Sequence, residues 1–326
     1  MTNPGRSRPS TAAVATALLI VYVVWGSTYL GIAVMIETMP PLLAAGVRYG
    51  TAGLIMLVAL VAHARWRSSN EPAERPTRAH VRSAFIIGSL LLLGGNGGVV
   101  LAELRIPSGI AAVLVATVPI WLAVFDAIVT RRRPSPLVIG GLVAGIAGVA
   151  VLLAPVEGLG HLDPIGVLLV LGAAISWAAG SLYARHAPLP RSGLLGTALE
   201  MMAGGVVLVA AGTLLGEVGR TDVTQFSLSS IVAIAYLVVF GSIVAFTAYT
   251  WLLANVPVST VGTYAYVNPI VAVALGALIL GEQITPRTLI AAAIIIGAVV
   301  AMVSGRPRAT EEPGPAPEAA TLEPTE

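Results

Sequence analysis

The side chains that could do chemistry in this sequence are a few polar and aromatic residues set inside long apolar stretches. Tyr264 and Asn268 are four residues apart, so in a helix they share one face. Asn268 precedes Pro269, whose missing N–H leaves a carbonyl one turn earlier without its helical partner. This pattern predicts a hinge and a polar cavity lining. The alternative is that Tyr264 and Asn268 hydrogen-bond to a neighbouring helix.

Two further pairs have the same spacing, Trp25 with Tyr29 and Trp177 with Ser181. Aromatic walls bind amphipathic or cationic solutes through apolar burial and cation–π contacts. We therefore expect these four residues to line a solute cavity. For Tyr29, which lies nearer a segment end, anchoring at the membrane surface is the alternative. Asn96, flanked by glycines, is assigned either to the cavity or to an interhelical hydrogen bond.

Two charged residues, Arg48 and Glu200, fall inside apolar stretches, where a charge is a candidate functional group by default. Their positions along the segments place them roughly 12 Å apart across a bilayer core of about 30 Å, too far for a direct ion pair. We expect each to polarise one end of a solute path. Glu200 is the candidate for binding a cation or a coupling proton. Snorkelling or a hydrogen bond to a neighbouring helix is the alternative for both.

The sequence lacks the residues that several chemistries require. It has no cysteine, and all of its basic residues are arginine, so it cannot contain a P-loop lysine or a thiolate site. The histidines do not have the four-residue spacing of a helical zinc pair. No catalytic residue, metal or cofactor is therefore expected. The histidines are His63, His80, His161 and His186.

The composition indicates an integral membrane protein. Of 326 residues, 56% are hydrophobic and 10% are charged, whereas a soluble domain has about 25% charged residues. The isoelectric point near 9.1 does not indicate nucleic-acid binding, because the arginines are scattered between apolar stretches instead of forming one basic surface.

The apolar stretches are long enough to cross a bilayer as helices, which takes about 20 residues. They are continuously apolar and do not alternate, so the sequence predicts an all-α fold and not a barrel. The predicted transmembrane segments are 12–36, 42–63, 83–102, 107–129, 136–154, 164–184, 194–215, 229–252, 257–280 and 285–304.

The distribution of arginine predicts the orientation. With the N-terminus in the cytosol, 14 arginines fall on the inside and three on the outside, which favours cytosolic termini at both ends. The first segment, 25 residues long, exceeds a signal-peptide core and is interpreted as an uncleaved helix. Residues 1–11 form a cytosolic N-terminus, and residues 305–326, rich in Pro, Ala and Glu, are expected to be a disordered cytosolic tail.

The sequence contains an internal repeat. At an offset of 150, prolines 107, 119 and 136 align with prolines 257, 269 and 286. At an offset of 152, Trp25 aligns with Trp177 and Gly53 with Gly205. Each unit has five segments, an odd number, so the second unit, 155–304, enters the membrane from the side opposite to the first, 12–154. Inverted repeats of this kind support alternating access in secondary transporters; chance similarity between apolar helices is the alternative.

Several motifs in these segments resemble those of EamA-type transporters of the drug/metabolite transporter superfamily, most closely inner-membrane exporters of the YedA type. The resemblance covers about residues 12–304. It implies a ten-helix fold with a central cavity between the halves and the transport of small solutes, commonly efflux. The sequence departs from internal symmetry at one place, since residues 131–133 are arginines where the second half has Gly281, Glu282 and Gln283. The motifs are 25–29, 40–41, 48–49, 95–97, 106–109, 117–119, 264–269 and 280–282.

Small residues recur at every fourth position in the fifth and tenth segments and predict close helix packing, either within one chain or in a homodimer. These residues are Gly140, Ala144, Gly148, Ala293, Gly297 and Ala301.

The resulting hypothesis is a secondary transporter of the cell inner membrane that moves metabolites, amino acids or amphipathic drugs. Because no ATP motif is present, a proton gradient or solute exchange would drive it. Two alternatives stay open. A lipid-modifying membrane enzyme would need clustered Asp, His or Glu at one membrane face, and a receptor or scaffold would favour a large extramembrane domain; neither feature is found in the sequence.

Overall fold

The computed structural model describes residues 9–66, 74–131, 136–153, 162–256, 258–261 and 263–304. Every regular element within these ranges is helical. In this part of the chain, seven helices are long and apolar enough to cross a membrane, and three shorter apolar helices accompany them. The termini at 1–8 and 305–326, including the predicted tail, lie outside the described residues.

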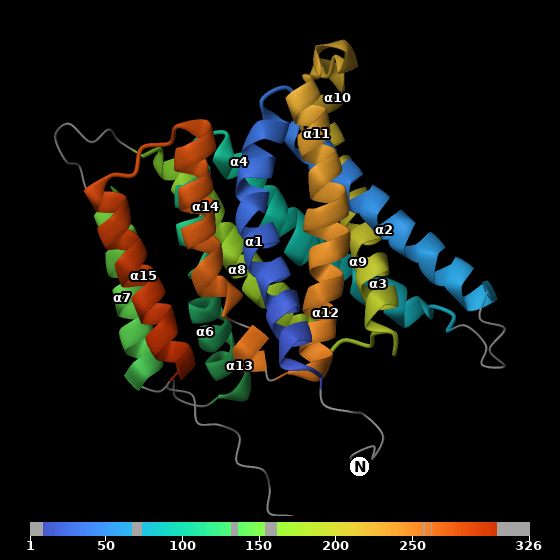
Figure 1. Ribbon diagram of the computed structural model, residues 1–326, viewed down its shortest axis with the longest axis horizontal. Coiled ribbons are helices and arrows are strands. Elements are labelled where there is room, and N and C mark those ends of the chain that lie inside the picture. Colours follow the sequence, from blue (N-terminus) through green and yellow to red (C-terminus); the bar gives the residue numbers. More distant parts are fainter. Residues whose placement is uncertain are drawn as a thin grey trace, which may run out of the picture.

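The helices of the first half are α1 (Thr11–Ile36), α2 (Pro41–Trp66), α3 (Arg78–Gly88), η1 (Ser89–Gly97), α4 (Gly98–Glu103), α5 (Ser108–Val115), α6 (Val118–Thr130) and α7 (Pro136–Leu153). Those of the second half are α8 (Pro164–Ala184), α9 (Gly193–Leu214), α10 (Glu217–Arg220), η2 (Val223–Gln225), α11 (Leu228–Tyr236), η3 (Leu237–Val244), α12 (Ala245–Asn255), α13 (Val258–Val261), α14 (Tyr264–Leu280) and α15 (Pro286–Ser304). In Figure 1, α1 begins and α15 ends at the same, lower end of the bundle.

Polar residues at the helix starts explain several of these boundaries. Ser10, Asp163, Ser192 and Ser227 each accept a hydrogen bond from a backbone N–H in the first turn of the helix that follows. Such a cap satisfies a backbone donor that has no partner inside the helix. The helices therefore begin where the sequence offers a hydroxyl or carboxylate just before an apolar run.

The third membrane-crossing segment of each half contains a π-helical turn. In the first half η1 joins α3 to α4, and in the second half η3 joins α11 to α12. A π-helical turn leaves backbone carbonyls without their usual partner. In η1 the carbonyls of Leu91 and Leu90 accept hydrogen bonds from Asn96 and Ser176. Both halves thus carry an irregular, polar turn at the same place in their sequence.

Matching helices of the two halves pack against each other, α2 on α9 and α7 on α15 (Figure 1). The α2–α9 contact is close enough to require glycine. A Cβ on Gly205 of α9 would lie 2.6 Å from the backbone nitrogen of Gly50 on α2. In the α7–α15 contact, a Cβ on Gly148 would lie 2.6 Å from Cγ1 of Ile295. Gly148 of the fifth segment therefore serves packing within one chain.

Each half also supplies a carboxylate that caps the second long helix of the other half. Glu217, which begins α10, accepts hydrogen bonds from the backbone nitrogens of Leu42 (3.2 Å) and Leu43 (2.9 Å) at the start of α2. Glu74, just before α3, accepts from the nitrogens of Arg191 (3.0 Å) and Ser192 (3.2 Å) at the start of α9.

We call these two contacts the carboxylate clasps. α10 lies at the upper end of the bundle in Figure 1 and the start of α3 at the lower end, so the clasps hold opposite ends of the molecule. Carboxylates at helix N-termini are favoured because they meet free N–H groups and the positive end of the helix dipole. At Glu74 the amides of Arg191 and Ser192 lower the pKa of the carboxyl below its ordinary value.

Two further contacts hold the end of the bundle to which Glu217 belongs. Glu282 accepts hydrogen bonds from the nitrogen and Oγ of Ser108 (2.7 Å each) and from the nitrogen of Gly109 (3.0 Å), and so caps α5. Arg105 and Asp163 form a salt bridge of 2.8 Å, and the Arg105 hydrogen bond lowers the pKa of Asp163.

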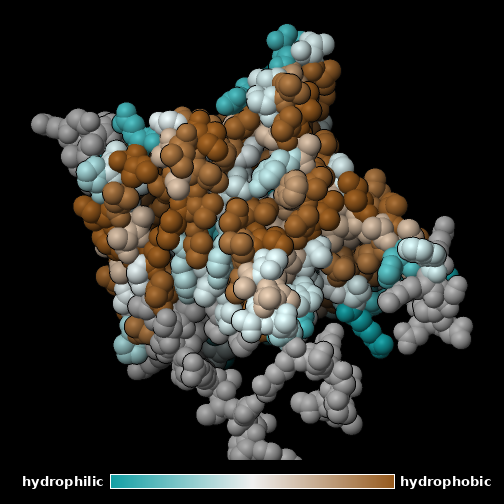
Figure 2. All heavy atoms as spheres, viewed as in Figure 1, coloured by the Kyte–Doolittle hydropathy of each residue, from teal (hydrophilic) through white to brown (hydrophobic). Residues whose placement is uncertain are grey.

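The flank of the molecule is apolar. Figure 2 shows hydrophobic side chains over most of the visible face, with hydrophilic ones gathered toward the two ends. Large apolar residues on different helices are well exposed, among them Leu19 (60%), Val143 (62%), Leu168 (67%) and Leu278 (82%). A continuous apolar surface of this kind suits contact with lipid and not with water.

Candidate functional site

An aromatic cluster surrounds Trp25 where α1 meets the second half. The ring centroid of Trp25 lies 5.1 Å from Phe246, 5.0 Å from Tyr249 and 5.2 Å from Tyr264. Its indole nitrogen donates to the carbonyl of Gly241 at 3.2 Å. Trp25 and Tyr264, which the sequence assigns to a common cavity, are thus brought together across the joint between the halves.

The side chain of Asn268 hydrogen-bonds to backbone carbonyls at the same joint. With its amide nitrogen facing α1, it donates to the carbonyls of Tyr264 and Tyr22, each at 3.2 Å. The side chain is 7% exposed. This is the interhelical hydrogen bond that the sequence leaves open as an alternative, and Asn268 here ties α14 to α1.

Asn96 and Trp177 lie together at the contact between η1 and α8. Asn96 Nδ2 donates to the carbonyl of Leu91 at 3.4 Å. Trp177 covers Gly95, where a Cβ would lie 2.8 Å from ring atom Cε3. The glycines around Asn96 therefore let the tryptophan ring approach the backbone of η1. Ser181, one turn further along α8, is partly buried.

Arg48 is buried inside the bundle, with 3% of its surface exposed. Its Nε donates to Oγ of Ser242 on η3 at 3.1 Å, and its guanidinium carbon lies 4.5 Å from the ring centroid of Tyr49. Nearby, the hydroxyl of Tyr236 is 2.6 Å from Oγ of Ser27. A charge from the first half is thus held by the irregular turn of the second half.

Glu103 is a residue that the sequence prediction missed. It ends α4 and interacts electrostatically with Arg48 and Tyr29, and both of its carboxylate oxygens are buried. The prediction ends the third segment at 102, so Glu103 falls in a loop. Its position directly beside the last apolar residue is the signal that could have identified it.

Glu200 lies elsewhere, at the contact between α9 and α3. A Cβ on Gly88 of α3 would lie 2.8 Å from the Glu200 carbonyl. Among the described residues no charged side chain interacts with the Glu200 carboxylate. Arg48 and Glu200 are therefore not brought together.

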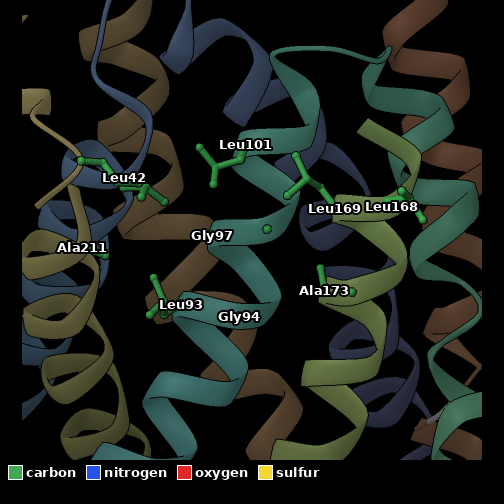
Figure 3. Close-up of a pocket in the computed structure, with 12 residues that line it drawn as sticks. Leu42, Leu93, Gly94, Gly97, Leu101, Leu168, Leu169, Ala173 and Ala211 are labelled. Carbon is green, nitrogen blue, oxygen red and sulfur yellow. The ribbon is translucent and has the colours of Figure 1, made fainter. Parts of the chain in front are cut away.

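A cavity of about 350 Å³ lies beside η1 and α4. Leu42 of α2, Leu101 of α4, Leu169 of α8 and Ala211 of α9 point toward it, and the backbone of Gly97 borders it (Figure 3). Its lining contains none of the nine candidate residues of the sequence analysis. It is an apolar groove separate from the aromatic and charged groups at the joint.

The fold and the buried polar groups define a helical membrane protein with polar groups enclosed between two similar halves. A family model described as the EamA-like transporter family matches residues 12–154 and again residues 164–304. The chain belongs to the EamA-like transporter family and is a transporter of small solutes.

Individual relatives support this assignment. The chain is 41% identical over 297 residues to "Uncharacterized inner membrane transporter YedA" of Escherichia coli K12, covering 89% of this chain and 90% of that protein. It is 25% identical to a "Probable amino-acid metabolite efflux pump" of Salmonella typhimurium, over 88% of this chain and 93% of the other. A solved structure described as "Crystal structure of protein" has a TM-score of 0.57 at 20% identity, covering 90% of this chain and 96% of that one, and so shares the fold.

Proposed function

We propose that this transporter lies in a bacterial-type inner membrane with both termini in the cytoplasm, and that it exports small organic solutes by alternating access. Seven long apolar helices and three shorter ones would make ten crossings, five in each of the repeats 12–154 and 155–304. The name of the E. coli relative supports the location, and the efflux pump supports the direction.

The buried contact between Arg48 and Ser242 is the main support for this proposal. It places a charge from the first repeat against the π-helical turn of the second repeat. Buried charges inside a membrane protein mark solute and ion paths, because they are costly anywhere else. A turn with irregular hydrogen bonding can also rearrange when the repeats rock against each other.

We assign the solute site to the predicted residues at or near the joint. Trp25, Tyr29 and Tyr264 would form an aromatic wall, Arg48 a charged pole, and Asn268 a polar contact; Asn96, Trp177 and Ser181 would line the path on the η1–α8 side. Glu200, partly buried and without a charged partner among the described residues, is the predicted group for proton or cation coupling. If Glu200 does not couple transport to protons or another cation, solute exchange would drive transport in place of the proton gradient.

A homodimer through α7 and α15 stays a prediction. Gly148 is already used within the chain, so a second copy would have to pack on the outer faces of these helices. A Cβ on Gly140 or Gly297 would meet nothing within 4 Å in the described part of the chain, which leaves room for such a contact at these two positions.

The proposal is tested in proteoliposomes. Uptake of labelled amino acids, nucleoside-like compounds and cationic drugs is measured with and without a proton gradient. The apparent affinity for the solute with the highest uptake is then compared between the wild type and Trp25→Ala. Loss of aromatic contacts worth about 0.5–1.5 kcal/mol each should weaken apparent affinity roughly tenfold.

The matched control for this variant is Trp66→Ala. Trp66 is 89% exposed at the end of α2 and should be replaceable without effect on transport. Equal affinity in the two variants would exclude the aromatic wall from the site, and no uptake of any class would argue against solute transport.

A further inference from the structure

Glu103 has an unusual environment for a carboxylate. Both of its oxygens are buried, and neither has a hydrogen-bond partner among the described residues. Two other carboxylates of the bundle are satisfied: Glu217 accepts two backbone N–H groups, and Glu282 accepts two N–H groups and a hydroxyl. An ionised carboxylate without water or partners is strongly disfavoured.

The groups that face Glu103 come from three parts of the chain. Arg48 on α2 is the positive charge, Glu282 after α14 is a negative charge, Tyr29 on α1 is a phenol, and Tyr49 lies beside Arg48. The helices η1, α5 and α8, which also pack near α4, carry no charged side chain. The charge at Glu103 is therefore balanced by one cation, with Glu282 opposing it.

Arg48 has unused hydrogen-bonding capacity as well. Its Nε donates to Ser242, while its two terminal nitrogens have no hydrogen-bond partner in the described part of the chain. Arg48 and Glu103, although in electrostatic contact, are not joined by a salt bridge. Among the described residues, the two terminal guanidinium nitrogens of Arg48 and the carboxylate of Glu103 thus lack hydrogen-bond partners, and the two side chains interact electrostatically.

We infer that Glu103 is a proton-binding site and that Arg48 is the counter-charge that controls its occupancy. With the proton bound, Glu103 is neutral and the pair carries the net positive charge of Arg48. With the proton released, the pair is neutral. Protonation therefore switches the charge of a buried site at the joint of the two halves, without any covalent step.

One consequence rests on the proposed transport function. A solute with an anionic group, such as a carboxylate, would bind to the terminal nitrogens of Arg48 when Glu103 holds its proton. The binding of proton and anion would then favour each other by equal factors, as thermodynamic linkage requires. Proton binding at Glu103 itself does not depend on whether the protein transports anything.

The test is an infrared titration of the full-length protein in lipid nanodiscs, using protons alone as the ligand. The wild type should show the carbonyl band of a buried carboxylic acid, and the band should disappear on raising the pH. Glu103→Gln should remove that band. Glu37→Gln, which changes an exposed carboxylate, should keep it.

A second pair of variants tests the counter-charge independently and serves also if Glu103→Gln does not fold. Arg48→Gln removes a cation that favours ionised Glu103, so the band should persist to a pH roughly 1–3 units higher. Arg48→Lys keeps the charge and should leave the midpoint closer to that of the wild type.

Three results would overturn the inference: a wild type without a titrating acid band, a band that survives Glu103→Gln, or a band that is lost in Glu200→Gln instead. Failure of every cargo in the transport screen would leave the titration unaffected, so the two proposals are tested separately.

Discussion

Buried polar side chains in this transporter are used mainly to satisfy backbone groups or one another. Asn268 donates to two carbonyls, and Asn96 and Ser176 each satisfy a carbonyl of η1. Inside a membrane such partners are needed because there is no water to replace them. The sequence identifies these residues by their polarity in apolar runs. It does not give their partners, because these lie on other helices.

The hydrogen bond between Arg48 and Ser242 should stabilise the folded protein more than a hydrogen bond between neutral groups does. Ser242→Ala should lower the free energy of unfolding by about 1.5–3 kcal/mol, because it removes a hydrogen bond to a buried charge. Ser176→Ala is the matched variant, since it removes a neutral serine–carbonyl bond of 2.8 Å and should cost about 0.5–1.5 kcal/mol. Reversible unfolding in detergent measures both. Equal losses in the free energy of unfolding would show that the hydrogen bond between Arg48 and Ser242 stabilises the protein no more than a neutral one does.

At the level of the helices, the close contact of α2 with α9 sets the geometry of the joint. Gly205→Ala would place a methyl group 2.6 Å from the backbone of Gly50, so the two helices must separate. Overpacking of this kind costs about 1–3 kcal/mol, and we expect a lower melting temperature and reduced transport. Gly50→Ala is the control, because a Cβ there meets nothing within 4 Å. A stable, active Gly205→Ala protein would mean that the helices are not in contact at this position.

The carboxylate clasps should act as gates at opposite ends of the molecule. Glu217→Gln weakens the cap on α2 and should raise the reactivity of introduced cysteines on the Glu217 side. Glu74→Gln should do so on the Glu74 side. Because the chain has no cysteine of its own, each single-cysteine variant reports one position. Both substitutions raising reactivity on the same side would contradict a gating role.

The Glu74 clasp should also depend on pH. Its pKa is lowered in the folded protein by the Arg191 and Ser192 amides, so its stabilising contribution is present above the ordinary pKa of glutamate, about 4.3. That contribution is lost as the pH falls through the lowered pKa of the folded state. Measured relative to a fully exposed reference cysteine, because thiol reactivity itself falls with pH, reactivity on the Glu74 side should therefore rise only in acid, and Glu74→Gln should remove this pH dependence. A wild-type profile that is flat in acid would show that the clasp does not contribute.

For the whole molecule, the sequence predicts the helical segments and the family because both depend on local information. An apolar run of sufficient length becomes a helix wherever its neighbours lie. Contacts between distant residues are less accessible to such reasoning. Glu217 and Leu42, for example, are 175 residues apart, and the burial of Glu103 depends on helices from both halves. The π-helical turns carry no clear sequence pattern and become visible only in the structure.

We propose that the solute path follows the joint between the two halves. The most direct measurement uses Phe246→Cys, next to Trp25, and a membrane-impermeant maleimide added to either side of the membrane. Val143→Cys, on the exposed apolar flank, is the control and should react only with a lipid-soluble reagent. Alternating access predicts that Phe246→Cys is labelled from each side in separate experiments. Labelling from neither side, with the same lipid-only pattern as Val143→Cys, would contradict a path at this joint.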